Sequence, residues 1–255
     1  MLTELAYLYG VPESTGHLRS KMSDFVVKEK LPFSPSGTGE HLLIHIRKTG
    51  VNTAFVAKQL AKYFSVKEQM VTYAGLKDRF AVTEQWFGVH MPGKGVDDLS
   101  NFAVEGVEVL SYARHDKKLR IGALTGNNFT ITLREVSNPN DVIRRWHAIT
   151  EYGVPNYYGE QRFGINGGNI DKAKAMFAGA KVKDRKKRSI YLSAARSYLF
   201  NRLVSDRVQN NDFDTLYQGD VMMLAGTQSI FPLEDVDSLV KQRFNEKDID
   251  LTACL

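Results

Sequence analysis

The chain has 255 residues, 43% hydrophobic and 25% charged, as is typical of a globular protein with one large domain or two ordinary ones. Its formal net charge of +5 attracts polyanions without specifying them. The single cysteine, Cys254, excludes a disulfide framework and a cysteine-based metal site. The sequence shows no secretory signal and no run of about 18 apolar residues, so we expect a cytoplasmic protein that does not bind a membrane.

The first half of the chain alternates strand-like and helix-like patterns. Strands are predicted at 24–31, 40–48, 70–75, 83–91, 107–115 and 128–136. Between the second and third strands, residues 52–64 predict a helix with Asn52 or Thr53 as its N-cap. Asp78 follows the third strand, and we expect it in a tight turn at the tip of a hairpin.

The second half changes in character after residue 152. Helices are predicted at 139–151, 169–178 and 192–209. Residues 153–169 are rich in glycine and aromatic residues, which indicates an irregular, exposed crossing. We therefore expect a domain boundary near residue 152, between domains at 1–152 and 153–255. The last segment, "NEKDIDLTACL", stops on an apolar stretch with no closing element, which is typical of a chain that ends partway through a domain.

Basic residues gather in two clusters. Residues 181–188 hold six Lys or Arg among eight positions, and residues 114–120 hold four among seven. One such cluster would be explained as a solvated surface. Two clusters in a chain with 11% aromatic residues make nucleic-acid binding an equally good explanation.

Two motif-like spacings do not carry the chemistry that they resemble. Residues 88–95 have the glycine–lysine spacing of a P-loop, but Gly95 stands where magnesium binding needs a hydroxyl. His41 and His45 have the spacing of metal ligands on a helix, yet they lie in a strand pattern that separates them by about 13 Å. We therefore expect no metal site and no nucleotide cofactor.

Asp78 lies between Lys77 and Arg79 and allows two interpretations. Its local spacing alone favours a solvated turn. The alternative is a catalytic carboxylate that stays ionised beside an anionic substrate. One acid, two basic regions and several aromatic residues suffice for base isomerisation in RNA, where a carboxylate acts as nucleophile or base on a flipped uridine.

The segment "GLKDRFAVTEQW" resembles the signature around the catalytic aspartate of the TruD family of tRNA pseudouridine synthases, with Asp78 at the aspartate position. "RSKMSDFVVKE", "GNNFTITLRE", "GVPNYYGEQRFG" and "RSIYLSAARSYLFN" resemble further segments of the family in the same order. The resemblance implies that Phe25 and Asn127 contact substrate. Phe129 falls where an aromatic residue packs near the target base, although its strand alternation also allows a core position.

The resemblance further implies that Lys77 and Arg79 assist substrate binding beside an ionised Asp78. The basic run would contact RNA phosphates through Lys181, Lys183, Arg185, Lys186, Lys187 and Arg188. The cleft between two lobes would hold the tRNA, and aromatic residues would receive the flipped base.

The expected fold class is α+β, with a catalytic domain built on a mixed, mainly antiparallel sheet flanked by helices. An incomplete α/β insertion (TRUD) domain would follow, because family members continue further and return to the catalytic domain with another substrate-contacting phenylalanine. The implied reaction converts uridine 13 of tRNA to pseudouridine in a monomer without metal or organic cofactor. The alternatives are a non-catalytic RNA-binding fragment or degenerate homologue, and an ATP-driven RNA enzyme that uses Lys94.

Overall fold

The computed structural model describes residues 5–93, 98–227 and 229–252, so Lys94, Gly95 and Cys254 lie outside the described residues. The chain forms two compact units, one of residues 14–139 and one that combines residues 1–13 with 140–255. This division differs from the expected boundary near 152, which concerns the two family domains and stays a prediction. No helix within the described ranges has the length and apolarity needed to cross a membrane.

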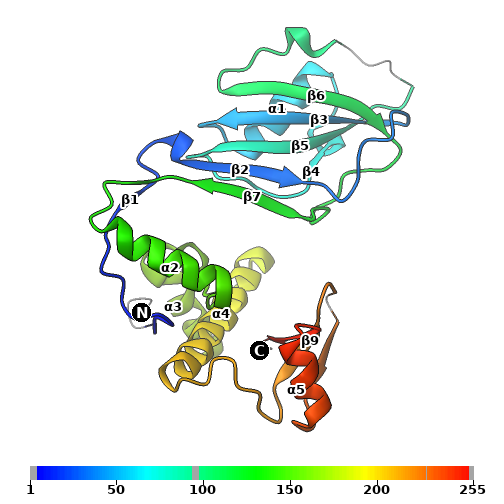
Figure 1. Cartoon of the computed structure of the whole chain (residues 1–255). Coiled ribbons are helices and arrows are strands. Elements are labelled where there is room, and N and C mark those ends of the chain that lie inside the picture. Colours follow the sequence, from blue (N-terminus) through cyan, green and yellow to red (C-terminus); the bar gives the residue numbers. More distant parts are fainter. Residues whose placement is uncertain (1–4, 94–97, 228, 253–255) are drawn as a thin grey trace. The chain divides into compact units, whose positions relative to one another are not determined.

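The 14–139 unit is built around a six-stranded sheet (Figure 1). Its strands are β2 (Phe25–Lys30), β3 (His41–Thr49), β4 (Val71–Tyr73), β5 (Val82–His90), β6 (Val107–His115) and β7 (Gly126–Ile131). Their order is β6-β3-β5-β2-β7, with β4 also paired to β5. The β2–β5 pair is parallel and the other pairs are antiparallel, which confirms the predicted mixed, mainly antiparallel sheet.

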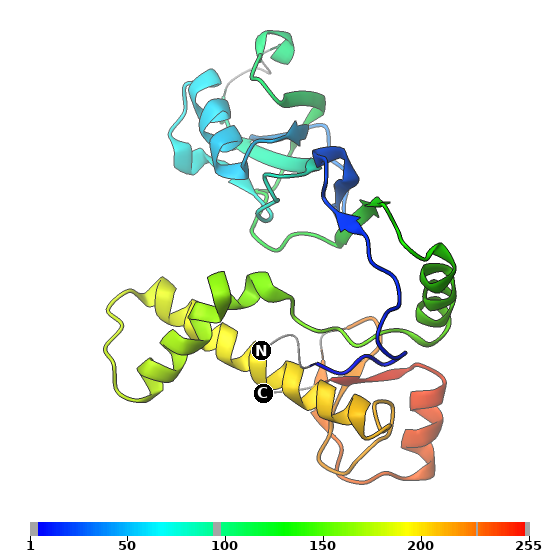
Figure 2. The same cartoon turned by 90° about the vertical axis from the view of Figure 1, so that its left-hand side faces the viewer.

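Helix α1 (Thr53–Tyr63) covers one face of this sheet (Figures 1 and 2). Asn52 caps it by accepting a hydrogen bond from the Phe55 amide at 2.8 Å, as one of the two predicted caps. Leu42, Ile44 and Ile46 are fully buried on the α1 side, which confirms the predicted alternation of β3. The first unit also contains the short pair β1 (His17–Leu18) and β8 (Leu133–Arg134) and the 3-10 turns η1 (Met22–Asp24), η2 (Glu68–Met70) and η3 (Leu99–Asn101).

The predicted tight turn at Asp78 is wrong. Tyr73 of β4 pairs with Phe87 of β5, so 13 residues separate the paired positions and residues 74–81 form a longer connection. The beginning of β5 pairs with β2 and β3 instead of β4. The predicted strand at 128–136 is also interrupted, because the Thr132 amide donates to the Asp24 carbonyl between β7 and β8.

The second unit begins with helices. They are α2 (Pro139–Tyr152), α3 (Gly168–Phe177) and α4 (Arg185–Gln209), with 3-10 turns η4 (Glu160–Phe163) and η5 (Ile165–Gly167). Helix α4 starts inside the basic run and not at 192 as predicted. The Asp184 carboxylate caps it by accepting hydrogen bonds from the amides of Lys186 at 2.8 Å and Lys187 at 3.2 Å.

The C-terminal part of this unit has its own small sheet (Figure 2). It comprises β9 (Val221–Leu224), β10 (Ile230–Pro232) and β11 (Ile249–Thr252), together with helix α5 (Ser238–Asn245). Val240 and Phe244 of α5 pack on a buried cluster that includes Met222 and Ile249. The sequence predicted none of these elements, since the strands have only three or four residues each.

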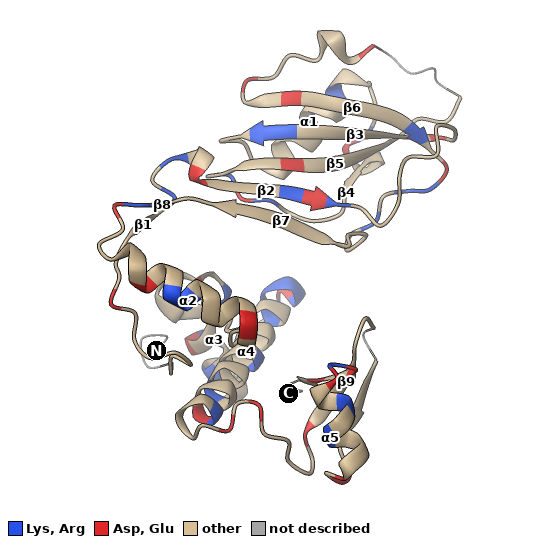
Figure 3. Cartoon of the chain, in the orientation of Figure 1, with Lys and Arg blue, Asp and Glu red and all other residues tan. Residues whose placement is uncertain are grey.

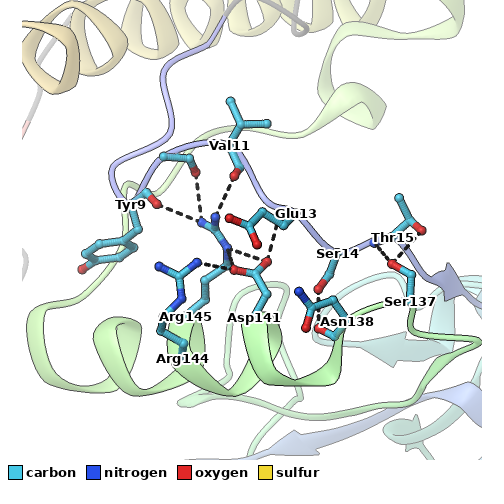
Figure 4. A network of polar contacts seen from close by, with 11 residues as sticks. Tyr9, Val11, Glu13, Ser14, Thr15, Ser137, Asn138, Asp141, Arg144 and Arg145 are labelled. Carbon is cyan, nitrogen blue, oxygen red and sulfur yellow. Dashed lines mark hydrogen bonds and ion pairs between the residues drawn. The ribbon is translucent and has the colours of Figure 1, made fainter.

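The N-terminal segment is fastened to α2 (Figure 4). The Arg145 guanidinium donates to the carbonyls of Tyr9, Gly10 and Val11 at 3.1, 2.9 and 2.7 Å. The carboxylate of Asp141 accepts from the Glu13 amide at 3.0 Å and pairs with Arg145. Burial raises the pKa of Asp141, but hydrogen bonds from Arg145 and Arg144 outweigh this and lower it to about 2.

Candidate active site

Asp78 forms an ion pair with an arginine that the sequence reasoning did not single out. Arg19 Nη2 lies 3.0 Å from Asp78 Oδ2, which is the length of a charge-assisted hydrogen bond. The two side chains are 36% and 34% exposed, so a substrate can still reach the carboxylate. Arg79, the sequence neighbour, instead donates from Nε to the Gly50 carbonyl at 3.0 Å. The one available signal for Arg19 was its place in "RSKMSDFVVKE".

Arg19 also joins the acid to a pair of aromatic rings. Its guanidinium carbon lies 3.9 Å from the ring centre of Phe25, within the range of a cation–π contact. The Phe25 ring is in turn tilted against Phe129, with 5.9 Å between centroids. Phe25 is 8% exposed, whereas Phe129 is 58% exposed, so a core position for Phe129 is wrong.

The register of β2 with β7 explains why these side chains share one face of the sheet. Val27 lies opposite Phe129, and Glu29 lies opposite Asn127. Directly opposed residues of antiparallel strands project to the same side, and so do alternate residues of one strand. The exposed Asn127 and Phe129 therefore stand on the face to which Phe25 contributes its ring.

Lys77 is held differently from a solvent-exposed substrate cation. Its ammonium lies 2.7 Å from Glu29 Oε2, and the two side chains are 7% and 0% exposed. Its amide donates to the Thr53 hydroxyl at 3.1 Å. Lys77, which directly precedes Asp78, is thus bound to both β2 and the start of α1.

A second lysine, Lys48 of β3, lies beneath the Asp78 segment. It is 1% exposed, and Nζ donates to the carbonyl oxygens of Val51 at 2.8 Å and Asp78 at 3.0 Å. Burial is the main reason that the pKa of Lys48 is lowered to about 8; the charge of Asp78 opposes this shift, and the charge of Lys77 adds to it. A buried cation therefore supports the backbone of the candidate catalytic residue.

The entry to the Asp78 segment is fixed by a buried side-chain relay. Thr53 Oγ1 donates to Gln85 Oε1 at 3.0 Å, and Gln85 Nε2 donates to the Gly75 carbonyl at 2.6 Å. Gln85 is fully buried in the middle of β5. These bonds connect helix, strand and loop, so the position of Asp78 depends on packing from three elements.

The opposite face of the sheet carries a charge network formed by charged residues of β2, β3, β5 and β6, whose positions along the strands are coloured in Figure 3. Glu84 of β5 pairs with Arg47 at 3.1 Å and with Lys28 at 3.3 Å, and Arg47 pairs with Glu108 at 2.8 Å. On that face the ring of His45 stacks on Trp86 at 4.6 Å, and His41 stacks on His90 at 4.7 Å. Among the described residues, no group of three or more His, Cys, Asp or Glu could hold a metal ion.

The predicted phosphate-contacting residues lie in the second unit, where Figure 3 shows the basic N-terminal end of α4. All six are exposed: Lys181, Lys183, Arg185, Lys186, Lys187 and Arg188. Positive charges at a helix N-terminus oppose the helix dipole, so this placement does not serve the stability of α4.

Comparisons with known proteins agree along the whole length of the chain. The family profile described as tRNA pseudouridine synthase D (TruD) matches residues 2–176 and 169–255. The sequence is 64% identical over 253 residues to a tRNA pseudouridine synthase D of Colwellia psychrerythraea, covering 99% of this chain and 69% of that protein. It is 54% identical to a protein of the same description from Shewanella oneidensis, covering 100% of this chain and 68% of the relative.

The fold is also similar to a solved structure. A crystal structure of a TruD-type protein from Methanosarcina mazei superposes with a TM-score of 0.76 at 17% sequence identity. The match covers 96% of this chain and 74% of the other. At this level of identity the comparison supports the fold of both units but gives no information on the reaction.

Proposed function

The chain belongs to the TruD family of tRNA pseudouridine synthases, and from this we propose that it isomerises uridine 13 of tRNA to pseudouridine with Asp78 as the nucleophile. The observation that carries the proposal is the partly exposed carboxylate of Asp78, paired at 3.0 Å with Arg19 beside the aromatic pair of Phe25 and Phe129. A carboxylate that a neighbouring guanidinium holds in position is suited to nucleophilic catalysis.

The proposed reaction rearranges bonds within one nucleotide. Asp78 attacks the flipped nucleoside at its sugar or its base, and the bond between N1 and C1′ breaks. The detached uracil rotates, and C5 forms the new bond to C1′ as the bond to Asp78 breaks. The hydrogen on C5 then leaves as a proton, and N1 takes up a proton. The reaction needs no oxidant or reductant, because the product is an isomer of the substrate.

The surrounding residues support steps before and after the attack. The exposed ring of Phe129 offers a surface for the flipped uracil, since bases taken out of a stack are commonly received by aromatic side chains. The amide of Asn127 on the same face could hydrogen-bond the edge of that base, which would hold it during rotation. Arg19 would keep the Asp78 carboxylate oriented until the nucleoside arrives.

Release of tritium from tRNA labelled at C5 of uridine tests the proposal. Wild type should release tritium, and Asp78→Asn should lose at least about a thousandfold in rate while it binds tRNA as before. Asp116→Asn is the matched control, because Asp116 is an exposed acid in the same unit and should keep full activity. A tRNA with cytidine in place of uridine 13 should release nothing from that position. Near wild-type turnover by Asp78→Asn would make the acid an ordinary loop residue.

RNA binding without turnover is a second candidate function. One observation favours it: the six basic residues around the start of α4 are all exposed, and RNA binding through such charges needs no catalytic acid. Tight tRNA binding with no tritium release by the 255-residue chain would support this alternative.

A further inference from the structure

The second unit contains a pocket that takes no part in the proposed chemistry at Asp78. Its volume is about 450 Å³, and it lies between α4 and the segment that leads into η4. The lining residues include Tyr158, Ser189, Ser193, Arg196, Ser197 and Phe200. Among the described residues that line it, none is acidic.

The wall opposite α4 is rigidly held. The amide of Tyr158 donates to Asn201 Oδ1 at 2.9 Å, and Asn201 Nδ2 donates back to the Tyr158 carbonyl at 2.9 Å. Asn201 is 1% exposed, so this pair of hydrogen bonds is shielded from water. The Tyr158 ring packs edge-on against Phe200 with 5.4 Å between centroids. The aromatic side of the pocket is therefore preformed.

Two arginines lie at the pocket: Arg196 is part of its lining, and Arg162 contacts two of the lining residues. Arg162 of η4 donates from Nη1 to the Ser193 hydroxyl at 3.2 Å, and its guanidinium carbon lies 4.9 Å from the Tyr158 ring centre. Arg196 lies on α4 three residues after Ser193 and lines the same pocket. Residues three apart on a helix are surface neighbours, so both guanidinium groups and the Ser193 hydroxyl serve one region.

We propose that this pocket binds a phosphodiester of the tRNA through Arg162 and Arg196, at a site separate from Asp78. The inference rests on the proposed function, because it takes tRNA as the substrate. A planar guanidinium matches the geometry of two phosphate oxygens, and serine hydroxyls can donate to the remaining ones. The pocket follows directly after the basic run along α4, since Ser189 succeeds Arg188. A strand of RNA on that run continues into the pocket.

Binding of tRNA to the 255-residue chain, measured by fluorescence anisotropy over a series of salt concentrations, tests this site. Replacing both arginines (Arg162→Gln with Arg196→Gln) should weaken binding by about tenfold or more, because hydrogen bonds to charged groups are lost. The log–log salt slope should fall by about 0.7–0.9 for each phosphate contact removed. Ser193→Asp should also weaken binding, since it places a carboxylate beside Arg162 that would repel a phosphate. This variant keeps both arginines.

The matched control is the pair Lys172→Gln with Lys241→Gln, which removes the same charge from exposed positions on α3 and α5. If the arginine pair and the lysine pair lost the same amount of tRNA affinity, the proposed phosphate site would be wrong. Binding would then reflect only the general attraction of a basic protein for RNA. Melting curves followed by circular dichroism show whether each variant is folded, so that a loss of tRNA affinity is not confused with unfolding. If the double arginine variant does not fold, the affinity of Ser193→Asp still tests the site.

Tritium release separates this inference from the proposed function. If wild type binds tRNA but does not isomerise it, the proposed function fails, and the pocket still stands on the binding data. If the arginine variants turn over tRNA with an unchanged KM, the pocket fails and the proposed function stands. The expected result is a raised KM with kcat nearly unchanged, because the phosphate contact takes no part in the rearrangement of bonds at the nucleoside.

Discussion

The ammonium of Lys48 lies 3.0 Å from the main-chain oxygen of Asp78, and Lys48 is shielded from water, with 1% of it exposed. Charged and ionisable groups that act on Lys48 are Asp78, which favours its protonated form, and Lys77, which disfavours it. The backbone of the proposed nucleophile is thus bonded to a buried lysine, and its carboxylate is paired with the partly exposed Arg19. This pairing makes the backbone of the Asp78 segment sensitive to the protonation of a residue 30 positions earlier.

Lys48 should leave a signature in stability at alkaline pH. Its folded pKa of about 8 lies below the ordinary 10.5, so between these values the unfolded chain binds the extra proton. Stability from this group therefore rises with pH across that window, by up to about 3 kcal/mol. Relative to Lys48→Met, wild type should gain stability between pH 8 and 10.5 in urea unfolding. Lys62→Met, at an exposed position of α1, should track wild type at every pH.

Arg19→Gln should lower the rate of isomerisation about 10- to 100-fold, because the Asp78 carboxylate loses the group that orients it. Arg79→Gln is the comparison, since Arg79 bonds a backbone carbonyl and should change the rate much less. Single-turnover tritium release measures both. Equal effects from the two substitutions would argue against a special role for the Arg19–Asp78 pair.

Asp141→Asn should destabilise the second unit, because it weakens the pairs with Arg144 and Arg145 and the hydrogen bond from the Glu13 amide. We expect the melting temperature to fall by several degrees. The folded pKa of about 2 lies below the ordinary 3.8, so this stabilisation is present above pH 4 and is lost as the pH falls toward 2. Asp171→Asn, at an exposed site on α3, should show neither effect in thermal melts at pH 7 and pH 3.

Replacing Lys183, Arg185, Lys186 and Arg188 together with Gln should weaken tRNA binding and lower the salt slope by about 0.7–0.9 per lost phosphate contact. The same change should leave α4 as stable as before or slightly more stable, since positive charges at a helix start are unfavourable. Filter binding and circular dichroism give the two measurements. An unchanged slope would identify the run as a solvated surface.

Patterns within one segment were enough for much of the fold. The alternation of Leu42, Ile44 and Ile46 located β3, and Asn52 located the start of α1, because both signals reside in neighbouring residues. The start of α4 was missed because Asp184, its cap, is embedded in a run of lysines and arginines whose charge dominates the pattern. The strands after residue 220 were missed because their short apolar runs fit several structures equally well.

The shape of the site depended on contacts that no local pattern contains. Asp78 stood out in the sequence, but the connection around it is set by Lys48 and Thr53, which lie in β3 and at the start of α1. Arg19 reaches Asp78 across 59 positions of the chain, so its role needed the three-dimensional arrangement. The pocket at Arg162 likewise needed the packing of Tyr158 against α4.

The attachment of residues 6–13 to the second unit affects the order in which the protein can fold as it is synthesised. The Ala6 amide donates to the Ser205 hydroxyl at 2.9 Å, and Arg145 holds the next residues, so both partners leave the ribosome long after the segment itself. Residues 14–139, whose ends meet through the hydrogen bond from Ser14 to the Asn138 carbonyl, can fold in the meantime as a continuous piece. Residues 6–13 are therefore synthesised early but reach their final contacts late. A nascent chain stalled before α4 would carry a folded sheet, while residues 6–13 would still lack their contact with Ser205.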